Sequence, residues 1–375
     1  MELFRYPETY GKRAPQLVLK ETNARRLLRS VLAGQTSRAA LAKAHDLSPT
    51  TVSALVDELI AGGILTEAGE AALPRAGRRP TMLEVKASGG SVAVVTLRQD
   101  GLELRVCDLG QRVLGSAGLP WEEAKTVGDA LEVLLGKVRI RKLRGVCLIP
   151  SDRFSLRDGE LRCDAPAVRW TSEQLQEAAS ALRAPVLCGN AATFAAAALA
   201  SPGKSLLYLR FDESIRAGVV LDGQVWECGG RAPEAAHLCI DPQGPLCACG
   251  GHGCLCCYWA RSVLLQKAGV SDWETFCRAY QEYDPSAREV ITDAAGPLAL
   301  ALGNLCCMFP VSTVILDGLD GLGESFLYAV RRQISALGSV RFPGRMELRL
   351  APTGTNLACA GAVRSFLTEA MQLVD

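Results

Sequence analysis

The segment CACGGHGCLCCYWA, residues 247–260, places five cysteines, one histidine and three glycines within fourteen positions. Thiolates and imidazoles are preferred zinc ligands, and thiols are also the side chains that oxidants convert to disulfides. Three interpretations are open from this segment alone: a metal cage, a redox switch, or a chance cluster in a chain that has 15 cysteines. The choice between these interpretations depends on which helices and strands surround the segment and position its side chains.

The composition, with 49% hydrophobic and 22% charged residues, is typical of a soluble globular protein, and 375 residues predict two or three structural units. The N-terminus mixes charged and polar residues where a signal peptide would be apolar. The most apolar stretch, 295–316, is interrupted by glycine, asparagine and proline, so no membrane span is predicted. Many cysteines without a secretory signal indicate a reducing, cytoplasmic location, where thiols are buried or bind metal.

Residues 21–67 carry the clearest helical pattern. Apolar residues at helical spacing predict a first helix, a short second helix capped by Ser37, and a third helix opened by Ser48 and Pro49. A turn at Asp46 separates the last two, which predicts a helix-turn-helix. In that motif the N-terminal residues of the third helix reach base edges in DNA. The candidate DNA-binding residues on this helix are Ser48, Thr50, Thr51 and Ser53.

Residues 64–85 predict two short strands around a flexible loop, the pattern of a wing. Arg75, Arg78 and Arg79 lie on this loop, where they suit phosphates or a minor groove. The first 90 residues carry 13 Lys and Arg against 9 Asp and Glu, a weakly basic balance compatible with nucleic acid. A helical domain that packs against a partner protein is the alternative. The order of helices, wing and arginine loop favours double-stranded DNA.

From about residue 91 the pattern alternates between strands and helices, which predicts an α/β body. Three strands followed by a helix and a strand start at residue 91, and strands of the same kind restart at residue 205. This repetition predicts two related lobes with a cleft between them.

A winged head, the linker AGRRP, two α/β lobes and the segment HLCIDPQGPLCACGGHGCL together resemble the ROK family of repressors, open reading frames and sugar kinases. The resemblance extends from Asn23 to the C-terminal GAVRSFL, and the winged head is similar to the repressor branch. It implies a two-lobed body with the actin-like, ribonuclease H-like fold of sugar kinases. The expected domains are a head and linker over 1–88, a first lobe over 89–200 completed by a C-terminal helix over 356–375, and a second lobe with the cysteine loop over 201–355.

His237, Cys247, Cys249 and Cys254 match the zinc ligands of this family in type and spacing. One imidazole and three thiolates suit tetrahedral Zn²⁺, and the glycines between the cysteines allow a tight loop around one ion. Four protein ligands leave no open coordination position, so we expect a structural zinc. The alternative is four buried or oxidised thiols without metal, which a reducing cytoplasm disfavours.

Cys256, Cys257 and His252 are surplus to this cage. We expect His252 to face solvent and both cysteines to be ordinary buried thiols. A redox-sensing disulfide between the two adjacent cysteines would be strained, so this hypothesis ranks low.

The resemblance also implies a sugar site that has lost its chemistry. Asn190, Glu234 and His237 match positions that bind sugar in the family's kinases. Ala191 stands at the position of the catalytic aspartate, and Cys256 stands at the position of a sugar-binding glutamate. Without the aspartate, no group is placed to accept the proton of the sugar hydroxyl. We therefore expect a degenerate ligand-binding site.

ATP is not an expected cofactor. The segments at the positions of the family's phosphate loops are 94–98, 212–218 and 317–323. The first has neither the aspartate nor the glycines, and the other two carry carboxylates that repel phosphate. A phosphate cradle needs small flexible residues and backbone N–H groups. We expect no enzymatic activity.

These expectations favour a DNA-binding transcriptional regulator, a repressor by resemblance, that binds an inverted repeat as a homodimer or higher homo-oligomer. Its body would serve dimerisation and could hold a small-molecule effector. Two alternatives stay open: a sugar kinase with an atypical active site, against which Ala191 argues, and a regulator whose body docks another protein and binds no sugar.

Overall fold

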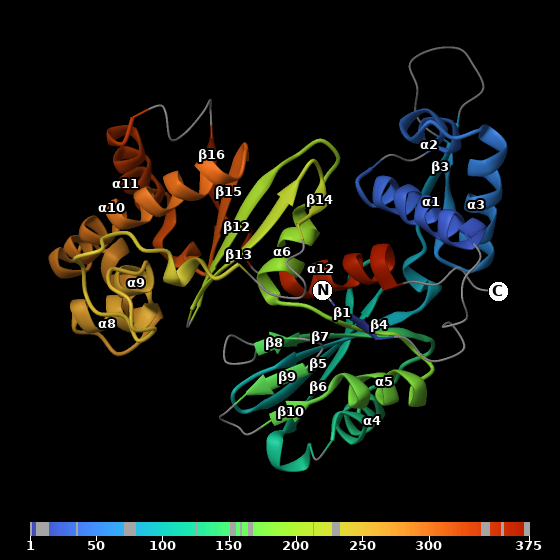
Figure 1. The fold of residues 1–375 in the computed structure, drawn as a ribbon, viewed down its shortest axis with the longest axis horizontal. Coiled ribbons are helices and arrows are strands. Elements are labelled where there is room, and N and C mark those ends of the chain that lie inside the picture. The colour runs from blue at the N-terminus through green and yellow to red at the C-terminus, as the bar shows by residue number, and fades with distance from the viewer. Residues whose placement is uncertain are drawn as a thin grey trace. The chain divides into compact units, whose positions relative to one another are not determined.

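The computed structural model describes residues 2–4, 15–34, 37–70, 80–124, 126–150, 155–157, 160–163, 168–212, 214–226, 233–338, 346–353 and 356–370. The chain divides into two compact units (Figure 1). Unit 1 is formed by residues 1–202 and 357–375, and unit 2 by residues 203–228 and 232–356.

Unit 1 contains, over residues 15–85, three helices and a two-stranded antiparallel sheet, which together have the arrangement of a winged helix-turn-helix. Ser37 and Ser48 cap the second and third helices, and Asp46 between them has a left-handed φ of 53°. The predicted head is therefore confirmed as a fold. Its elements are α1 (Pro15–Leu32), α2 (Arg38–His45), α3 (Pro49–Ala61), β2 (Leu65–Glu70) and β3 (Thr81–Val85).

The first lobe of the body is a mixed sheet. The first three strands, β4, β5 and β6, are antiparallel neighbours. Strand β7 then pairs in parallel with β4, and β11 pairs in parallel with β7. One face packs against α4 and α5 through buried aliphatic side chains such as Val95, Leu131 and Leu175. The elements are β4 (Ser91–Leu97), β5 (Gly101–Asp108), β6 (Val113–Pro120), α4 (Val127–Gly136), β7 (Leu143–Pro150), α5 (Ser172–Ala181) and β11 (Val186–Cys188).

Two additions to this lobe carry no clear signal in the sequence. Residues Glu2–Phe4 form β1, which pairs antiparallel with β11 at the edge of the lobe's sheet. The two strands are more than 180 residues apart in the sequence. A small antiparallel sheet consists of β8 (Ser155–Arg157), β9 (Glu160–Cys163) and β10 (Val168–Trp170). Strands of three or four residues are too short to show a period.

The C-terminal helix α12 (Leu357–Ser365) returns to unit 1 and packs closely on the alanine-rich helix α6 (Ala191–Leu199). A side chain at Gly361 would place its Cβ 1.6 Å from the carbonyl oxygen of Phe194, so this approach requires glycine. A π-helical segment, η6 (Phe366–Ala370), continues α12 and contacts α1 of the head.

Unit 2 repeats the topology of the first lobe. Strands β12, β13 and β14 are antiparallel neighbours, and β15 and then β16 add in parallel beside β12, so both units share the strand order 3-2-1-4-5. This confirms the expected sugar-kinase-like body of two related lobes. The strands are β12 (Leu206–Phe211), β13 (Ile215–Leu221), β14 (Gln224–Val225), β15 (Thr313–Asp317) and β16 (Glu347–Leu350).

The helices of unit 2 bury a core that includes Trp259, Phe276 and Phe326. Helix α10 is long and apolar enough to cross a membrane, but Leu298 and Leu302 are fully buried in this core, so it is a core helix. The helices are α7 (Cys256–Trp259), α8 (Arg261–Ala268), α9 (Trp273–Gln281), α10 (Pro285–Met308) and α11 (Gly323–Ala336).

Candidate functional site

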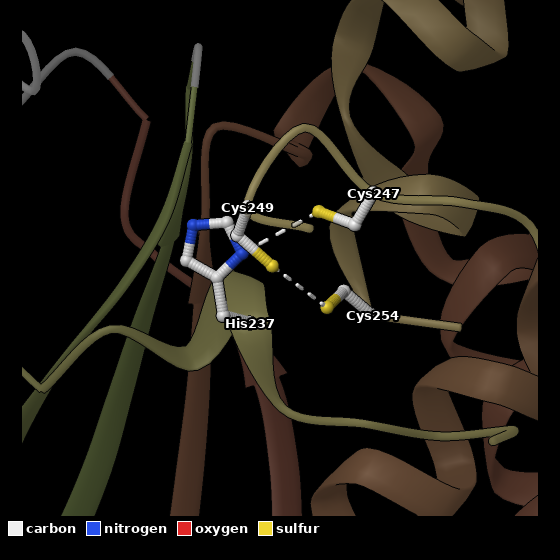
Figure 2. A group of neighbouring side chains, drawn as sticks. All are labelled: His237, Cys247, Cys249 and Cys254. Atoms are coloured by element: carbon white, nitrogen blue, oxygen red, sulfur yellow. Dashed lines mark hydrogen bonds between the residues drawn. The ribbon is translucent and has the colours of Figure 1, made fainter. Parts of the chain in front are cut away.

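The structure brings the four predicted zinc ligands together. His237 ends the short 3-10 helix η4 (Ala235–His237), and the three cysteines lie on the loop that follows (Figure 2). The four donor atoms all lie within 4.8 Å of one another. His237 Nδ1 is 3.6 Å from the Sγ atom of Cys247, and the Sγ atoms of Cys249 and Cys254 are 3.7 Å apart. Zn–S bonds of about 2.3 Å in a tetrahedron give an edge of about 3.8 Å, so the spacing fits zinc.

Glycine conformations shape the cage loop. Gly250 and Gly253 have left-handed φ values of 88° and 59°. A Cβ at Gly253 would lie 1.7 Å from the carbonyl oxygen of Asp241, whereas a Cβ at Gly250 would meet no atom within 4 Å. Backbone N–H groups of Cys247 and Gly250 close the turn by donating to Gly251 and Cys247, at 2.8 and 2.9 Å. The backbone thus presets the ligand positions.

The loop shifts the pKa values of its thiols in opposite directions. A backbone hydrogen bond from Cys249 lowers the pKa of Cys247 to about 6, whereas burial raises the pKa of Cys254 to about 12. A divalent cation among these donors would hold every thiol as a thiolate. The donor set fits a closed, structural zinc. His252 is exposed and its Nδ1 is 3.0 Å from the carbonyl oxygen of Gly244, outside the cage.

Cys256 is closer to the cage than the sequence indicates. It begins α7, and its Sγ is 3.5 Å from the Sγ of Cys247. Cys257 Sγ joins the same group, with all three sulfur atoms within 4.8 Å of one another. Both residues are half-buried rather than buried. The expectation of two ordinary buried thiols was therefore incomplete, because residue spacing did not show that Cys256 contacts a ligand.

The three predicted sugar-binding residues are distributed over the two units. Asn190, in unit 1, uses its side chain to cap α6: Oδ1 accepts from the backbone N–H of Thr193, and Nδ2 donates to its hydroxyl, both at 2.7 Å. Glu234, in unit 2, is exposed and lies 3.7 Å from Arg216, while His237 belongs to the cage. Each residue therefore already has a local partner.

Ala191 directly follows this cap as the first residue of α6. Its methyl group can neither accept nor carry a proton, so the position expected for a catalytic base holds none.

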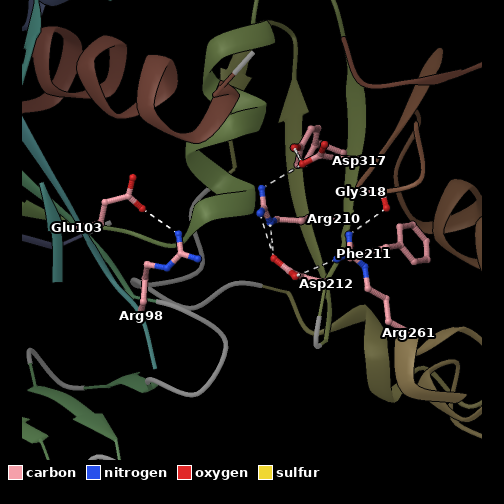
Figure 3. A network of polar contacts seen from close by, with 9 residues as sticks. Arg98, Glu103, Arg210, Phe211, Asp212, Arg261, Asp317 and Gly318 are labelled. Carbon is pink, nitrogen blue, oxygen red and sulfur yellow. Dashed lines mark hydrogen bonds and ion pairs between the residues drawn. The ribbon is translucent and has the colours of Figure 1, made fainter. Parts of the chain in front are cut away.

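The two carboxylate-bearing segments of unit 2 meet in an ion-pair network (Figure 3). Arg210 lies between Asp212 and Asp317, at 3.0 and 3.1 Å. Tyr208 donates a hydrogen bond to Asp317, and burial together with this carboxylate raises the pKa of Tyr208. Arg261 donates to the carbonyl oxygens of residues 211 and 318 at 3.3 and 3.1 Å. Both segments thus present carboxylates and carbonyl oxygens, which repel phosphate. The arginines beside them, Arg210 and Arg261, are already bound to these groups.

The remaining segment, 94–98, lies in unit 1 on β4, whose side chains are almost all buried. It ends at Arg98, which pairs with Glu103 at 2.9 Å. A buried strand paired on both sides, by β5 and by β7, has its backbone N–H groups engaged in the sheet. It offers no loop to cradle a phosphate.

The predicted DNA-binding residues gather at the start of α3. The hydroxyls of Ser48, Thr50 and Thr51 are exposed, and Ser48 Oγ lies 3.1 and 2.8 Å from the other two. Ser53 is half-buried, and its carbonyl accepts a hydrogen bond from Arg38. Arg38 also pairs with Asp57 on α3 at 2.8 Å and with Glu67 on β2, so α3 is held against the rest of the head. Arg75, Arg78 and Arg79 lie outside the described residues.

Polar contacts fasten the head to the first lobe. Arg144 on β7 donates to the carbonyl oxygens of Gly62, at the end of α3, and Gly89. Arg364 on α12 donates to the carbonyl of Leu32 at the end of α1, and the partly exposed Arg29 pairs with Glu369 in η6. The sequence alone did not indicate these residues, because each contact joins distant parts of the chain.

Comparison with known proteins settles the family. The model of the ROK family matches residues 164–368, more than half of the chain, a region that contains the cage, Asn190 and both carboxylate-bearing segments. This chain belongs to the ROK family. A xylose repressor from Caldicellulosiruptor bescii is 26% identical over 356 residues, which cover 85% of this ROK chain and 88% of the repressor. An N-acetylmannosamine kinase from Vibrio cholerae is 23% identical over 155 residues, 40% of this chain and 54% of the kinase.

Among solved structures, a ROK family transcriptional regulator described as a homologue of the Escherichia coli MLC protein has a TM-score of 0.76 and 20% identity to this ROK chain. The similarity covers 93% of this chain and 97% of that regulator, head and body together. A ROK hexokinase from Thermus thermophilus has a TM-score of 0.59 and 26% identity, covering 73% of this chain and 97% of the hexokinase. The regulator therefore shares nearly the whole fold, whereas the hexokinase lacks a counterpart for the rest of this chain.

Proposed function

We propose that this ROK protein is a DNA-binding transcriptional regulator that acts as a repressor in the cytoplasm. The observation that carries the proposal is the extent of the similarity. The xylose repressor matches across 85% of the chain, while the N-acetylmannosamine kinase matches only 40%. A match over 85% of the chain is longer than the body and extends into the head, whose three helices and wing strands have an arrangement suited to reading double-stranded DNA.

The start of α3 supplies the chemistry for base recognition. Exposed hydroxyls of Thr50 and Thr51 can donate to or accept from base edges, and the threonine methyls can contact thymine. Ser48 holds these hydroxyls by its cap, so they are preorganised on a fixed helix. Arg75, Arg78 and Arg79 would add sequence-independent phosphate or minor-groove contacts from the wing loop. Two such heads in a homodimer would read an inverted repeat.

The body is proposed to be without kinase activity. Ala191 supplies no base, and the carboxylates of Asp212 and Asp317 would face the phosphates of ATP with their own arginine already paired. Asn190 is committed to capping α6. The cage of His237 and three cysteines would hold a structural zinc, and the body would serve dimerisation and could receive a small-molecule effector.

Zinc in the cage would act by fixing the loop, without an open position for a reactant. Cys247, Cys249 and Cys254 would hold it as thiolates, and His237 would bind through Nδ1. Because the loop has little other secondary structure, the bound ion would contribute directly to the stability of this part of unit 2.

The proposal is tested by selecting binding sites from random double-stranded DNA with the purified full-length chain. We expect an enriched inverted repeat. Thr51→Ala should change the preferred sequence, whereas Thr51→Ser retains the hydroxyl next to Ser48, removes only the methyl and should alter at most a preference for thymine. The absence of any enriched motif for the folded protein would overturn the regulator assignment.

A parallel assay measures ATP consumption with a panel of hexoses. We expect no hexose-dependent turnover, and Ala191→Asp alone should not create it, since the pairing of Arg210 with Asp212 and Asp317 stays in place. Hexose-dependent turnover by the unmodified chain would show that the body is a kinase.

A further inference from the structure

The thiol of Cys256 lies against the metal cage without belonging to its four ligands. Its Sγ is 3.5 Å from the Sγ of Cys247, which is shorter than the 3.7 Å between the ligands Cys249 and Cys254. Cys256 stands at the start of α7, two residues after the last ligand. A free thiol is therefore in van der Waals contact with a metal-binding sulfur.

A second close pair of thiols provides a comparison within the same chain. The Sγ atoms of Cys107 on β5 and Cys359 on α12 are only 3.3 Å apart, but these residues are 0% and 3% exposed in the core of unit 1. The cage lies nearer the surface: Cys249 is exposed and Cys256 is half-buried, and Cys247, although buried between them, keeps 6% of its surface exposed. A small dissolved oxidant can reach the cage, whereas the buried pair is shielded from it.

We propose that Cys247 and Cys256 form a peroxide-sensitive disulfide that opens the metal cage. The thiolate sulfur of Cys247 attacks one oxygen of hydrogen peroxide, the O–O bond breaks, and a sulfenic acid forms; the hydroxide that leaves takes a proton from solvent and becomes water. The sulfur of Cys256 then attacks the sulfenic sulfur, the S–S bond forms, and the S–O bond breaks with release of a second water. In sum, one thiolate and one thiol lose two electrons; the proton of Cys256 and one proton from solvent complete the two waters to which one peroxide is reduced.

The geometry favours Cys256 over the other nearby thiols as the resolving partner. Cys249 and Cys254 hold the metal, so their sulfur lone pairs are engaged. Cys257 directs its Sγ towards the carbonyl oxygens of residues 245 and 246, at 3.8 and 4.0 Å. A disulfide between the adjacent Cys256 and Cys257 would be strained. Cys256 lies 3.5 Å from a ligand sulfur, is not one of the four ligands, and does not direct its thiol to a backbone carbonyl as Cys257 does.

Disulfide formation is incompatible with the intact cage. The two sulfur atoms, now 3.5 Å apart, must approach to about 2.05 Å, whereas a metal site tolerates deviations of only about 0.2 Å in its bond lengths. Cys247 would leave the coordination sphere, and His237, Cys249 and Cys254 would remain as three ligands. We therefore expect oxidation to release the metal.

The test uses the full chain, purified under reducing conditions, with its zinc content measured before any oxidant is added. Hydrogen peroxide is then added, and released zinc is followed with a chromophoric chelator. A non-reducing chymotryptic digest, cutting after Leu246, Leu255 and Tyr258, should link peptide 247–255 to peptide 256–258 by a reducible bond. The peptide with Cys107 should stay unlinked to the peptide with Cys359.

Cys256→Ser and Cys257→Ser are matched variants, because both remove a neighbouring thiol that is not a proposed ligand. We expect Cys257→Ser to keep the link and the rate of zinc release, and Cys256→Ser to lose the link and release zinc about tenfold more slowly. Cys256→Ala provides a second thiol-free variant if the serine disturbs folding. An unlinked digest of the oxidised parent, or equal release from Cys256→Ser, would overturn the proposal.

The zinc content measured at the start separates this proposal from the zinc assignment. If the reduced chain carries no zinc, the cage assignment fails, but the digest of the parent and of the two serine variants, with fragmentation of the linked peptides, still decides whether Cys247 and Cys256 pair. Neither readout depends on DNA binding.

Discussion

Two glycines of the cage loop offer a matched test of how the backbone prepares the metal site. Gly250 and Gly253 both have left-handed φ values, so alanine at either position carries a similar backbone cost of about 1–2 kcal/mol. They differ in their surroundings: the added Cβ meets nothing within 4 Å at Gly250, but lies 1.7 Å from the carbonyl oxygen of Asp241 at Gly253. The pair therefore separates backbone strain from steric exclusion.

Gly250→Ala should lower the melting temperature by about 2–8 °C, the equivalent of about 1–2 kcal/mol in a unit of this size, and keep its zinc. Gly253→Ala cannot keep its geometry, because an ordinary contact between the Cβ and the oxygen of Asp241 requires the chains to separate by more than an ångström. Metal ligands tolerate only about 0.2 Å. We expect Gly253→Ala to lose most of its zinc and considerably more stability than Gly250→Ala.

The assay combines elemental analysis of protein purified without added metal with thermal unfolding followed by circular dichroism. Cys249→Ala serves as a reference for loss of a ligand and should also lower both zinc content and stability. Stoichiometric zinc in Gly253→Ala, with a melting temperature equal to that of Gly250→Ala, would refute the idea that the close approach to Asp241 sets the cage.

Three further predictions concern the head and the ligand site. Ser48→Ala should destabilise the head by about 1 kcal/mol, measured by thermal unfolding, because the cap of α3 loses its acceptor, whereas Ser48→Asp should retain the cap. Burial lowers the pKa of His45 below 6.5, so the unfolded head binds more protons than the folded head as the pH falls. Its stability should therefore decrease on acidification through this range, and melts of His45→Gln should show a weaker pH dependence. Calorimetry with glucose, N-acetylglucosamine, N-acetylmannosamine and xylose should show no micromolar binding, because the two acceptors missing at Ala191 and Cys256 cost about 1–3 kcal/mol each, about a hundredfold or more together. Micromolar binding of any of these sugars would mean that Asn190, Glu234 and His237 suffice.

Local chemistry was readable from the sequence. The hydroxyls of Ser37 and Ser48 cap their helices by bonding to N–H groups three residues ahead, and Asp46 makes the turn between them. Interactions over three or four residues depend on residue type and order alone. The alternating strands and the cysteine spacing are also visible in this way, so the winged head, the repeated lobes and the set of four cage donors could be predicted.

Contacts between distant segments needed the tertiary structure. The pairing of β1 with β11 joins residues 2–4 to residues 186–188, and Arg144 reaches the head from β7. The sequence of one short strand, or one arginine, does not indicate which distant residues it contacts. The sequence showed carboxylates in two separate segments, but only the fold brought Asp212 and Asp317 to the same arginine.

Cys256 shows the difference most clearly. Its identity and its position after the last ligand were known from the sequence, which left it an ordinary thiol surplus to the cage. Its contact with Cys247 depends on how the loop reverses at its glycines and on the direction in which α7 begins. The sequence determines which reactive groups are available. Which of these groups come into contact depends on the path of the backbone and the direction of each side chain, and both are set by packing across the whole unit.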